Sequence, residues 1–363
     1  MKLQTIDVAG TPRQLGRATG EALRDRIPPF IEMRLTAVRG YMAERGYPDE
    51  WPKIFEVGEA SFALFEDWDP EGHAEHCGIA EGAGVDPVRL FTAANMTDMR
   101  DAVLLSAERG EPLRRLPEEG CSSLIVPADR TTVGGPLVGQ TWDLNPPDVE
   151  FIVAIRRRPT ASPQTWSVTC TGCLTLMGLN EHGLSVGTTN IKTYGSRPGV
   201  GYLSILHRAI RAVDAEEALA LVLSAPHAGA HTYWLADAHR QVEVEASPNA
   251  QIVRDASSGP LWRTNHCITE THQALEGEVP GDSSRARFAR LEQLAGSAHG
   301  VDPETVIRWF SDRSHGVHSI NRYPEDEQGT ATNAVFVASP AQAKGWACRG
   351  PADRGEWVEL SFD

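Results

Sequence analysis

The sequence lacks the surplus of basic residues that marks a nucleic-acid-binding protein. Its 363 residues include 34 Lys and Arg against 49 Asp and Glu, a formal net charge of -15 at pH 7. Binding a polyanion needs a basic surface, so we expect no nucleic-acid partner. The densest basic run, Arg156-Arg157-Arg158, follows the apolar residues 151–155 and is expected to be the solvated end of a strand.

Long apolar runs are also missing. No stretch approaches the roughly 20 apolar residues of a membrane-spanning helix, and the first residues show no apolar segment behind a basic end. We therefore expect neither a membrane anchor nor a signal peptide. The six cysteines stand at irregular positions, which does not indicate a disulfide framework in a chain of this length. A cytoplasmic protein with no membrane partner is the expectation.

Motifs for metals and nucleotides are scarce. The twelve histidines form no H-E-x-x-H motif. Cys170 and Cys173 have C-x-x-C spacing, but no second such pair or close His pair completes a zinc site, so a β-turn with two incidental thiols is favoured. The glycine-rich residues 195–201 lack the lysine and threonine of a phosphate-binding loop. No metal and no cofactor is expected.

The sequence does contain a mainly helical first part and a β-rich second part, which predicts the α+β class. Thr11, Pro12 and Gln14 supply a cap, a first-turn proline and a capping-box residue, and Pro28-Pro29 is expected to interrupt that helix. Strand runs, then helices, then strand runs favour a layered sandwich over a doubly wound sheet. Strands are expected at 123–126, 137–142, 151–155, 166–169, 184–189, 232–235, 241–245, 251–253, 334–337, 345–348 and 357–362, with helices at 202–213, 284–294 and 303–310 and a further helix capped by Asp214.

The dipeptide Gly120-Cys121 stands between a polar stretch, residues 109–120, and the apolar run 124–126. The polar stretch has few residues that could anchor it, so we expect an exposed, cleavable loop. Cleavage would free Cys121 as a new N-terminus, whose α-amine, with a usual pKa of about 7.7 to 8.0, can accept the thiol proton. The alternative is that Cys121 is a small buried hydrophobe whose reactivity is irrelevant.

A rival nucleophile is Ser185, in the G-x-S-x-G pattern of serine hydrolases at residues 183–187. That motif needs a strand before the serine and a helix after it, so that the hydroxyl is exposed on a strained turn. Here residues 180–183 predict a turn and residues 186–191 predict a strand, which is the reverse order. Ser185 therefore stays only as the alternative nucleophile.

Three short segments follow one another along the chain: EGCSS at 119–123, GQTWD at 139–143 and RTNH at 263–266. In this order they resemble the isopenicillin-N acyltransferase (acyl-CoA:6-aminopenicillanic acid acyltransferase) family of cysteine N-terminal-nucleophile (Ntn) hydrolases. The resemblance runs from about residue 8 to at least residue 270, and the order of its segments is more specific than any one motif. Further segments similar to the family are GTPRQLG at 10–16, GIAEGAG at 78–84 and GLNEHGL at 178–184.

The resemblance implies a four-layer αββα Ntn-hydrolase sandwich and a precursor that cleaves itself between Gly120 and Cys121. Residues 1–120 would form the α part and residues 121–363 the β part, which begins with the nucleophile. The two parts would stay associated within one composite domain.

The resemblance also implies roles for individual residues. Cys121 would attack the substrate to give an acyl-enzyme, Asn265 would donate a hydrogen bond to the oxyanion, and Asp143 would orient the N-terminal cysteine. Taken alone, Asp143 is a turn residue and Asn265 a strand-end cap. The order of all three favours the catalytic interpretation.

One candidate for substrate binding comes from a position where this chain departs from the family's pattern. The family's later Ser-Arg pair appears here as residues 328–330, so Arg285 is the nearest other arginine with a suitable place. Trp142 and His266 are the remaining candidates for substrate binding.

The sequence thus predicts an amidase or acyltransferase whose partner is a small-molecule substrate, either an N-acyl amide or an acyl thioester. It does not specify the acyl group, the acceptor or the oligomeric state. Two alternatives stay open: a serine hydrolase using Ser185, and a non-catalytic binding protein that retains the fold.

Overall fold

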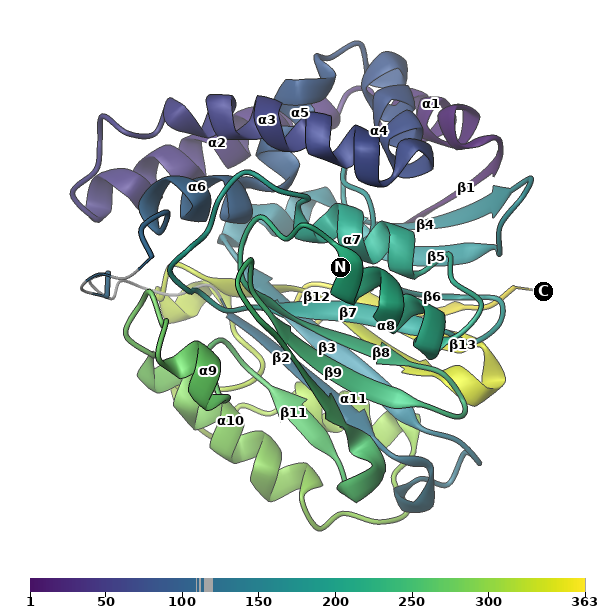
Figure 1. The fold of residues 1–363 in the computed structure, drawn as a ribbon. Helices are drawn as coiled ribbons and strands as arrows, with labels where there is room; N and C mark the ends of the chain where they lie inside the picture. The colour runs from purple at the N-terminus through teal and green to yellow at the C-terminus, as the bar shows by residue number, and fades with distance from the viewer. Residues whose placement is uncertain (109, 111, 114–119, 363) are drawn as a thin grey trace.

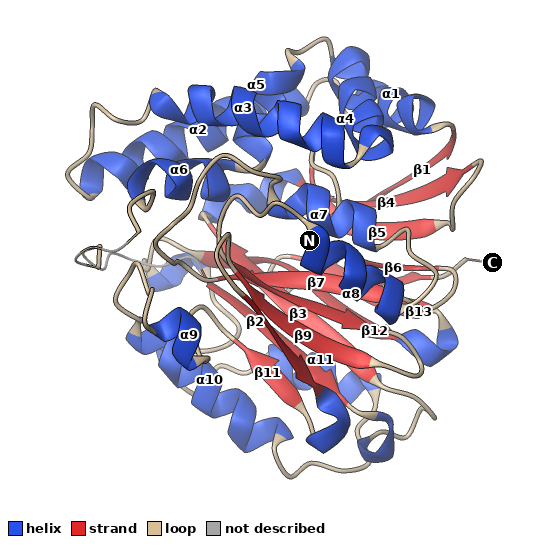
Figure 2. Ribbon diagram, viewed as in Figure 1, coloured by secondary structure: helices blue, strands red, loops and turns tan. Residues whose placement is uncertain are grey.

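Two β-sheets lie face to face between two layers of helices (Figures 1 and 2). The computed structural model describes residues 1–108, 110, 112–113 and 120–362. Strand β7 (Ser185–Asn190) of one sheet packs on β2 (Gly120–Val126) and β3 (Leu137–Leu144) of the other. The α+β class and the four-layer αββα order predicted from the sequence are confirmed.

The larger sheet has eight strands, and its first strand comes from the N-terminal part of the chain. Strand β1 runs parallel to β4, while the other neighbouring strands are antiparallel. Residues on both sides of position 120 therefore share one sheet. Its order is β1 (Gln4–Gly10), β4 (Ile152–Pro159), β5 (Thr165–Cys170), β6 (Met177–Asn180), β7, β8 (His231–Ala236), β9 (Gln241–Ala246) and β10 (Gln251–Asp255).

The smaller sheet has six antiparallel strands and carries Cys121. All seven residues of β2 and all eight of β3 are buried, because one face of these strands meets the larger sheet and the other meets helices. Apolar side chains alternate across such strands and fill both interfaces. The order is β11 (Leu261–Arg263), β2, β3, β12 (Ala331–Ser339), β13 (Lys344–Arg349) and β14 (Val358–Leu360).

Helices cover the outer face of each sheet (Figure 2). Over the larger sheet lie α1 (Pro12–Ala22), α2 (Ile27–Glu44), α3 (Lys53–Trp68), α4 (Pro70–Ala83), α5 (Pro87–Ala94), α6 (Met96–Leu104), α7 (Tyr202–Ala209) and α8 (Ala215–Ser224). Against the smaller sheet lie α10 (Asp282–Ala295) and α11 (Pro303–Phe310). The short helix α9 (Glu270–Gln273) contacts β9 of the larger sheet and the turn after it, through His272.

Two of the glycine-containing segments noted in the sequence meet where α1 crosses α4. A Cβ atom added at Gly16 would lie 1.9 Å from the carbonyl oxygen of Glu75, and one added at Gly78 would lie 2.3 Å from that of Arg13. Side chains at these positions would force the helices apart. The glycines therefore allow the close backbone approach.

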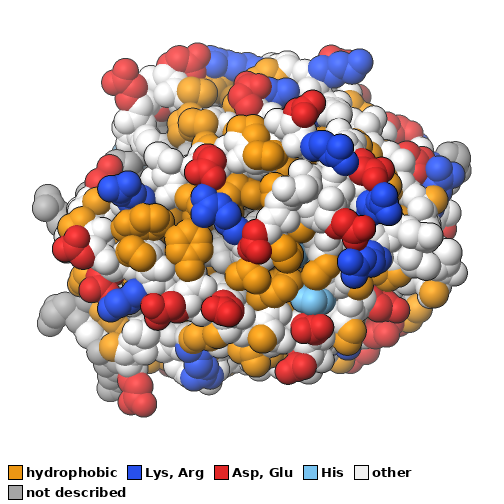
Figure 3. Space-filling view, turned by 90° about the horizontal axis from the view of Figure 1, so that it is seen from above, with side chains coloured by type: hydrophobic (Ala, Val, Ile, Leu, Met, Phe, Trp, Pro, Cys, Tyr) orange, Lys and Arg blue, Asp and Glu red, His pale blue; other side chains and the backbone are white. Residues whose placement is uncertain are grey.

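The outer face of the helical layer carries Lys and Arg interspersed with Asp and Glu, with hydrophobic side chains between them (Figure 3). Within the described part of the chain, no helix is both long enough and apolar enough to cross a membrane.

The structure differs from the sequence prediction at several elements. Strands β1 and β6 were not expected, and both are short strands completed by pairing in the larger sheet. Pro28-Pro29 lies in the first turn of α2, where missing N–H groups cost nothing, and α1 has already ended at Ala22. Most of the expected cleavable loop, residues 109, 111 and 114–119, lies outside the described residues. Among its described residues, Gly110 and Pro112 are exposed, as expected, whereas Leu113 and Gly120 are buried.

Candidate active site

Cys121 is the second residue of β2, at the end of the strand where the chain enters the sheet. In the antiparallel register Cys121 lies opposite Trp142, and Gly120 lies opposite Asp143. A Cβ atom at position 120 would be 2.5 Å from Arg322 Nη1 and 3.1 Å from Asp143 Oδ2. The Gly120-Cys121 peptide bond is therefore packed beside a buried carboxylate and a buried guanidinium.

Asn265 contacts Cys121 directly, although 144 residues separate them. Strand β11 pairs with β2 and ends at Arg263, so the next residues pass the start of β2. Asn265 Oδ1 accepts the backbone N–H of Cys121 at 2.8 Å, while Asn265 Nδ2 donates to the carbonyl oxygen of Asn190 at 3.0 Å. The two segments that the sequence analysis brought together, 119–123 and 263–266, are thus neighbours in space.

Arg287 also contacts Cys121, and it was not among the residues predicted from the sequence. Its buried guanidinium donates to the carbonyl oxygen of Cys121, to Ser122 Oγ at 3.0 Å and to Asn265 Oδ1 at 2.8 Å. Arg285, the residue proposed from the sequence, is exposed on the same helix. Residues two apart on a helix are rotated by about 200°, so only one of the two arginines can face the sheet.

A signal for Arg287 was present in the sequence of α10. Ser283, Arg287, Leu291 and Ala295 recur every fourth residue, and all are buried. A stripe of this spacing marks the face of a helix that packs against the rest of the protein. Arg287 belongs to that stripe, whereas Arg285 does not.

Asp143 is 1% exposed, and burial raises the pKa of its carboxyl group. The charges of Arg287 and Arg322, together with the nearby side chains of Thr332 and Thr141, act in the opposite direction but do not cancel the effect of burial. The carboxylate therefore carries its charge less readily than an exposed aspartate does.

A pocket opens at Cys121, with about 320 Å³ of space including its mouth. Trp142 and Asp143 belong to its wall. The other lining residues come from α6, α7 and strands β3, β7 and β8: Thr97, Leu144, Thr188, Asn190, Tyr202 and His231. A second, more polar pocket shares Asn190 and is lined in part by Asn265, Lys192, Glu276 and Glu278.

His266, the remaining candidate from the sequence, lines neither pocket. Its Nδ1 atom lies 2.8 Å from Ser284 Oγ. Burial and the nearby positive charges of Arg263 and Arg287 lower the pKa of His266 to about 4, so the ring is neutral at neutral pH.

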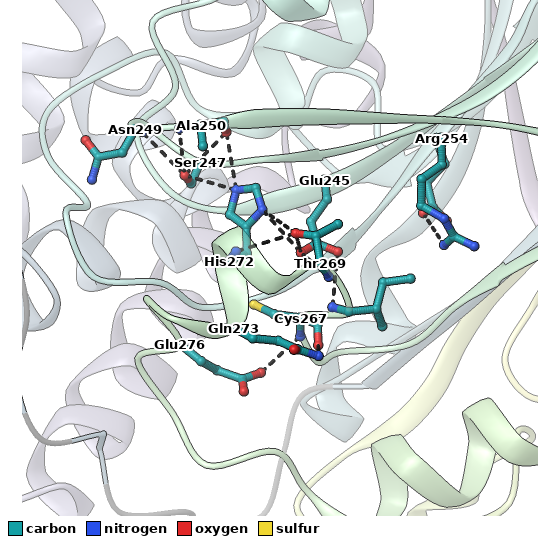
Figure 4. A network of polar contacts seen from close by, with 12 residues as sticks. Glu245, Ser247, Asn249, Ala250, Arg254, Cys267, Thr269, His272, Gln273 and Glu276 are labelled. Carbon is teal, nitrogen blue, oxygen red and sulfur yellow. Dashed lines mark hydrogen bonds and ion pairs between the residues drawn. The ribbon is translucent and has the colours of Figure 1, made fainter.

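The loop that carries Asn265 is anchored by the buried carboxylate of Glu245 on β9 (Figure 4). Glu245 accepts hydrogen bonds from the N–H groups of Ile268 and Thr269, both at 3.3 Å, and from Thr269 Oγ1 at 2.8 Å. It also pairs with His272 Nδ1 at 3.2 Å and with Arg263. Burial raises the pKa of Glu245, but these contacts outweigh burial and hold that pKa at about 2.

Residues 130–353 match the model of the acyl-coenzyme A:6-aminopenicillanic acid acyl-transferase family. The chain belongs to this family. It is therefore an enzyme of the amide hydrolase or acyltransferase class, which confirms the class predicted from the sequence. The matched range includes Asp143, Asn265 and Arg287 and begins after Cys121.

Solved structures of two bacterial enzymes are similar to this member of the acyl-transferase family. Penicillin V acylase from Agrobacterium tumefaciens is 15% identical with a TM-score of 0.45, and the match covers 66% of this chain and 86% of that one. A variant of conjugated bile acid hydrolase from Clostridium perfringens is 15% identical with a TM-score of 0.43, over 67% and 97% of the two chains. No curated protein matches the chain.

Ser185, the alternative nucleophile, has a different setting from Cys121 in this acyl-transferase family member. It opens strand β7, is fully buried, and its Oγ atom donates to the carbonyl oxygen of Gly183 at 3.4 Å. The turn before it and the strand after it follow the order predicted from the sequence. Ser185 therefore does not sit on an exposed strand-to-helix turn.

Cys170 and Cys173 lie at the end of β5 and in the turn that follows, both buried. Burial raises the pKa of Cys170 well above its usual value, which keeps that thiol protonated. Among the residues that the structure describes, no group of three or more His, Cys, Asp or Glu side chains is arranged to hold a metal ion.

Proposed function

We propose that this enzyme cleaves itself between Gly120 and Cys121 and then carries the acyl group of its substrate on the sulfur of Cys121. The observation that carries the proposal is the set of contacts at Cys121. Its backbone N–H binds Asn265, its carbonyl oxygen binds Arg287, and it opens onto a pocket large enough for a small acyl group.

Self-cleavage would begin with attack of Cys121 Sγ on the carbonyl carbon of Gly120. The C–N bond between the two residues breaks, its nitrogen takes a proton, and Gly120 is left joined to Cys121 through a thioester. Water then hydrolyses the thioester, which releases the carboxylate of Gly120 and restores the thiol. Asp143 and Arg322, which pack against Gly120, support this proposal because they can position the bond and offset charge that develops on it.

Catalysis would use the new α-amine of Cys121 as the base. The amine takes the thiol proton, the thiolate attacks the substrate carbonyl, and the protonated amine returns the proton to the leaving group. Asn265 Oδ1 already holds the backbone nitrogen that becomes this amine. The second hydrogen of Asn265 Nδ2, beyond the one bound to Asn190, is available for the oxyanion.

The substrate would be a small N-acyl amide or an acyl thioester. The lining of the pocket at Cys121 includes the apolar and aromatic side chains of Trp142, Leu144 and Tyr202, which suits the acyl part. The polar pocket that shares Asn190 suits the leaving group or an acceptor amine. Either water or an amine then takes the acyl group from Cys121.

The two parts, 1–120 and 121–363, would remain associated after cleavage as one composite domain. Strand β1 of the first part pairs with β4 of the second along seven residues. Cleavage at position 120 breaks none of these hydrogen bonds.

Intact-mass measurement of the purified protein tests the proposal. We expect two fragments that divide before Cys121, and Cys121→Ala should leave a single chain. The processed protein should then gain the mass of one acyl group on the fragment that begins with Cys121 when it is mixed with an activated acyl ester. A wild-type chain that stays uncut on long incubation would contradict self-cleavage.

A further inference from the structure

The wall of the pocket at Cys121 contains a buried hydrogen bond between His231 and Asp98 that the proposed reaction does not use. His231 Nε2 lies 2.6 Å from Asp98 Oδ1, and Asp98 Oδ2 accepts the backbone N–H of Tyr202 at 2.8 Å. His231 is 2% exposed and Asp98 is 1% exposed. His231 nevertheless lines the same pocket as Cys121.

Several buried polar atoms of residues in this pocket wall have no hydrogen-bond partner among the residues that the structure describes. They include Asp143 Oδ1 and Oδ2, which belong to the proposed reaction, and His231 Nδ1 and Thr97 Oγ1, which do not. Thr97 precedes Asp98 on α6, and both Thr97 and His231 line the pocket. A buried polar atom without a partner costs free energy comparable to a lost hydrogen bond, so such atoms in a ligand pocket point to a polar group on the ligand.

The contacts of His231 determine what that group must be. The carboxylate of Asp98 can only accept hydrogen bonds, so Nε2 of His231 carries the hydrogen of this bond, and Nδ1 is an acceptor in the form of the ring that holds this hydrogen alone. The ring of Tyr202 stacks on the ring of His231, with centroids 4.5 Å apart and planes 22° apart, which fixes the ring. A ligand atom that faces Nδ1 in this form of the ring is a hydrogen-bond donor.

The acyl group attached to Cys121 is the part of the substrate that can reach this site. His231 lies opposite Asn190 in the pairing of β8 with β7, and Asn190 accepts the hydrogen bond of Asn265 beside Cys121. We propose that the pocket selects acyl groups that carry a neutral donor, a carboxamide above all, with its N–H bound to His231 Nδ1 and its oxygen to Thr97 Oγ1. This inference rests on the proposed function of Cys121.

Three acyl groups of the same shape test the selection. They are the 4-methylpentanoyl, succinamoyl and succinyl groups, which end in an isopropyl, a carboxamide and a carboxylate, each joined to the same p-nitroaniline leaving group. The set is repeated with one methylene fewer and one more, because the depth of the pocket decides which length fits. For the processed wild-type enzyme we expect kcat/KM for the carboxamide to exceed that of both isosteres by at least tenfold at the best length.

Variants then assign the preference to named residues. His231→Phe keeps a ring and removes the acceptor, and Thr97→Val keeps the shape and removes the hydroxyl, so each should reduce the preference several-fold. His227→Phe is the matched control, because His227 is also buried and also contacts Tyr233, yet it does not line the pocket. The control should keep the wild-type preference, and Thr97→Val provides the test if His231→Phe does not fold.

Intact mass of the fragment that begins with Cys121 separates the possible failures. Equal kcat/KM for the three groups, or preference for the carboxylate, with Cys121 acylated in each case, would overturn this inference and leave the proposed function intact. No acylation of Cys121 by any member of the set would overturn both.

Discussion

Arg287 Nη2 donates a hydrogen bond of 2.8 Å to Asn265 Oδ1, the same oxygen that accepts the backbone N–H of Cys121. Two donors on Oδ1 fix the orientation of the side-chain amide, because its nitrogen must then point the other way. One Nδ2 hydrogen binds the carbonyl oxygen of Asn190 and the other remains for a substrate oxygen. Arg287 thus positions the residue proposed to stabilise the oxyanion.

Replacement of Arg287 by lysine should therefore impair both self-cleavage and turnover. Lysine keeps the charge but lacks the planar fork that reaches Cys121, Ser122 and Asn265 together. Hydrogen bonds from a charged donor contribute about 1.5 to 3 kcal/mol each, so loss of one or two predicts a fall in kcat/KM of roughly 10- to 10,000-fold. Steady-state kinetics and a time course of fragment masses measure the two effects.

The control is Arg285→Lys, at the exposed arginine on the same helix. It should leave the rate of cleavage and kcat/KM within about twofold of wild type, since exposed charges contribute little. Equal losses in the two variants would mean that Arg287 acts only through the stability of α10.

Alanine at position 120 should slow self-cleavage without impairing the mature enzyme. The added Cβ would approach Arg322 Nη1 and Asp143 Oδ2, so one of these buried groups must move from the bond to be cut. We expect cleavage at least tenfold slower, measured as loss of the intact chain. Fragments 1–120 and 121–363 produced separately should be equally active with either residue, because Gly120 is then only a chain end.

Gly40→Ala is the matched control for Gly120→Ala. Gly40 lies within α2, and a Cβ atom there would meet nothing within 4 Å. Alanine is favoured over glycine inside a helix by roughly 0.5 to 1 kcal/mol, so this variant should cleave at the wild-type rate and be slightly more stable.

The elements of this fold that carry their own local signals were predictable from the sequence. The N-terminus of α1 has the expected hydrogen bond from Thr11 N–H to Gln14 Oε1, and α11 has the predicted bounds, Pro303–Phe310. Strand β1 was not predicted because its seven residues are specified by pairing with β4, about 150 residues away, rather than by alternation of their own. Local patterns do not contain such long-range pairing.

The candidate site likewise contains residues that short motifs predicted and residues whose place depends on long-range packing. Cys121, Trp142 and Asp143 follow from short motifs on adjacent strands, and Asn265 from a motif at the end of a third. Arg287 and Arg322 have no motif, and their place near Asp143 depends on how α10 and the segment before β12 pack on the smaller sheet. Only the burial stripe of α10 could have indicated Arg287 in advance.

Glu245 should be needed for the position of Asn265 rather than for the chemistry itself. Glu245→Gln keeps the shape but removes the charge that binds Arg263 and the N–H groups of Ile268 and Thr269. We expect kcat to fall with little change in KM, and Tm to fall as well. Glu359→Gln, at an exposed carboxylate paired with Lys344, should change neither.

Glu245 also predicts how stability depends on pH. Its pKa is about 2 in the folded protein against a usual value of 4.5, so the charged form is favoured by folding. The contribution is fully present above about pH 4.5, amounts to at most about 3 kcal/mol, and is lost as pH falls toward 2. Denaturant titrations between pH 5 and pH 2.5 should therefore show a steeper loss for the wild type than for Glu245→Gln, and parallel curves would refute the assignment.

Asp143→Asn should separate activity from stability. Burial raises the pKa of Asp143, which means that folding disfavours its charged form, and this cost is present at every pH above that raised pKa. Asparagine has the same shape without the charge, so Tm at pH 7 should be unchanged or higher. If the carboxylate orients Cys121, the rate of self-cleavage and kcat/KM should both fall at least tenfold. In the wild type, activity that needs the ionised carboxylate should decline on acidification at a pH above the usual range of aspartate. To test this, we would measure the pH profile of kcat/KM for wild type and variant, with Tm in the same buffers. A variant that loses activity only because it unfolds would show a lower Tm.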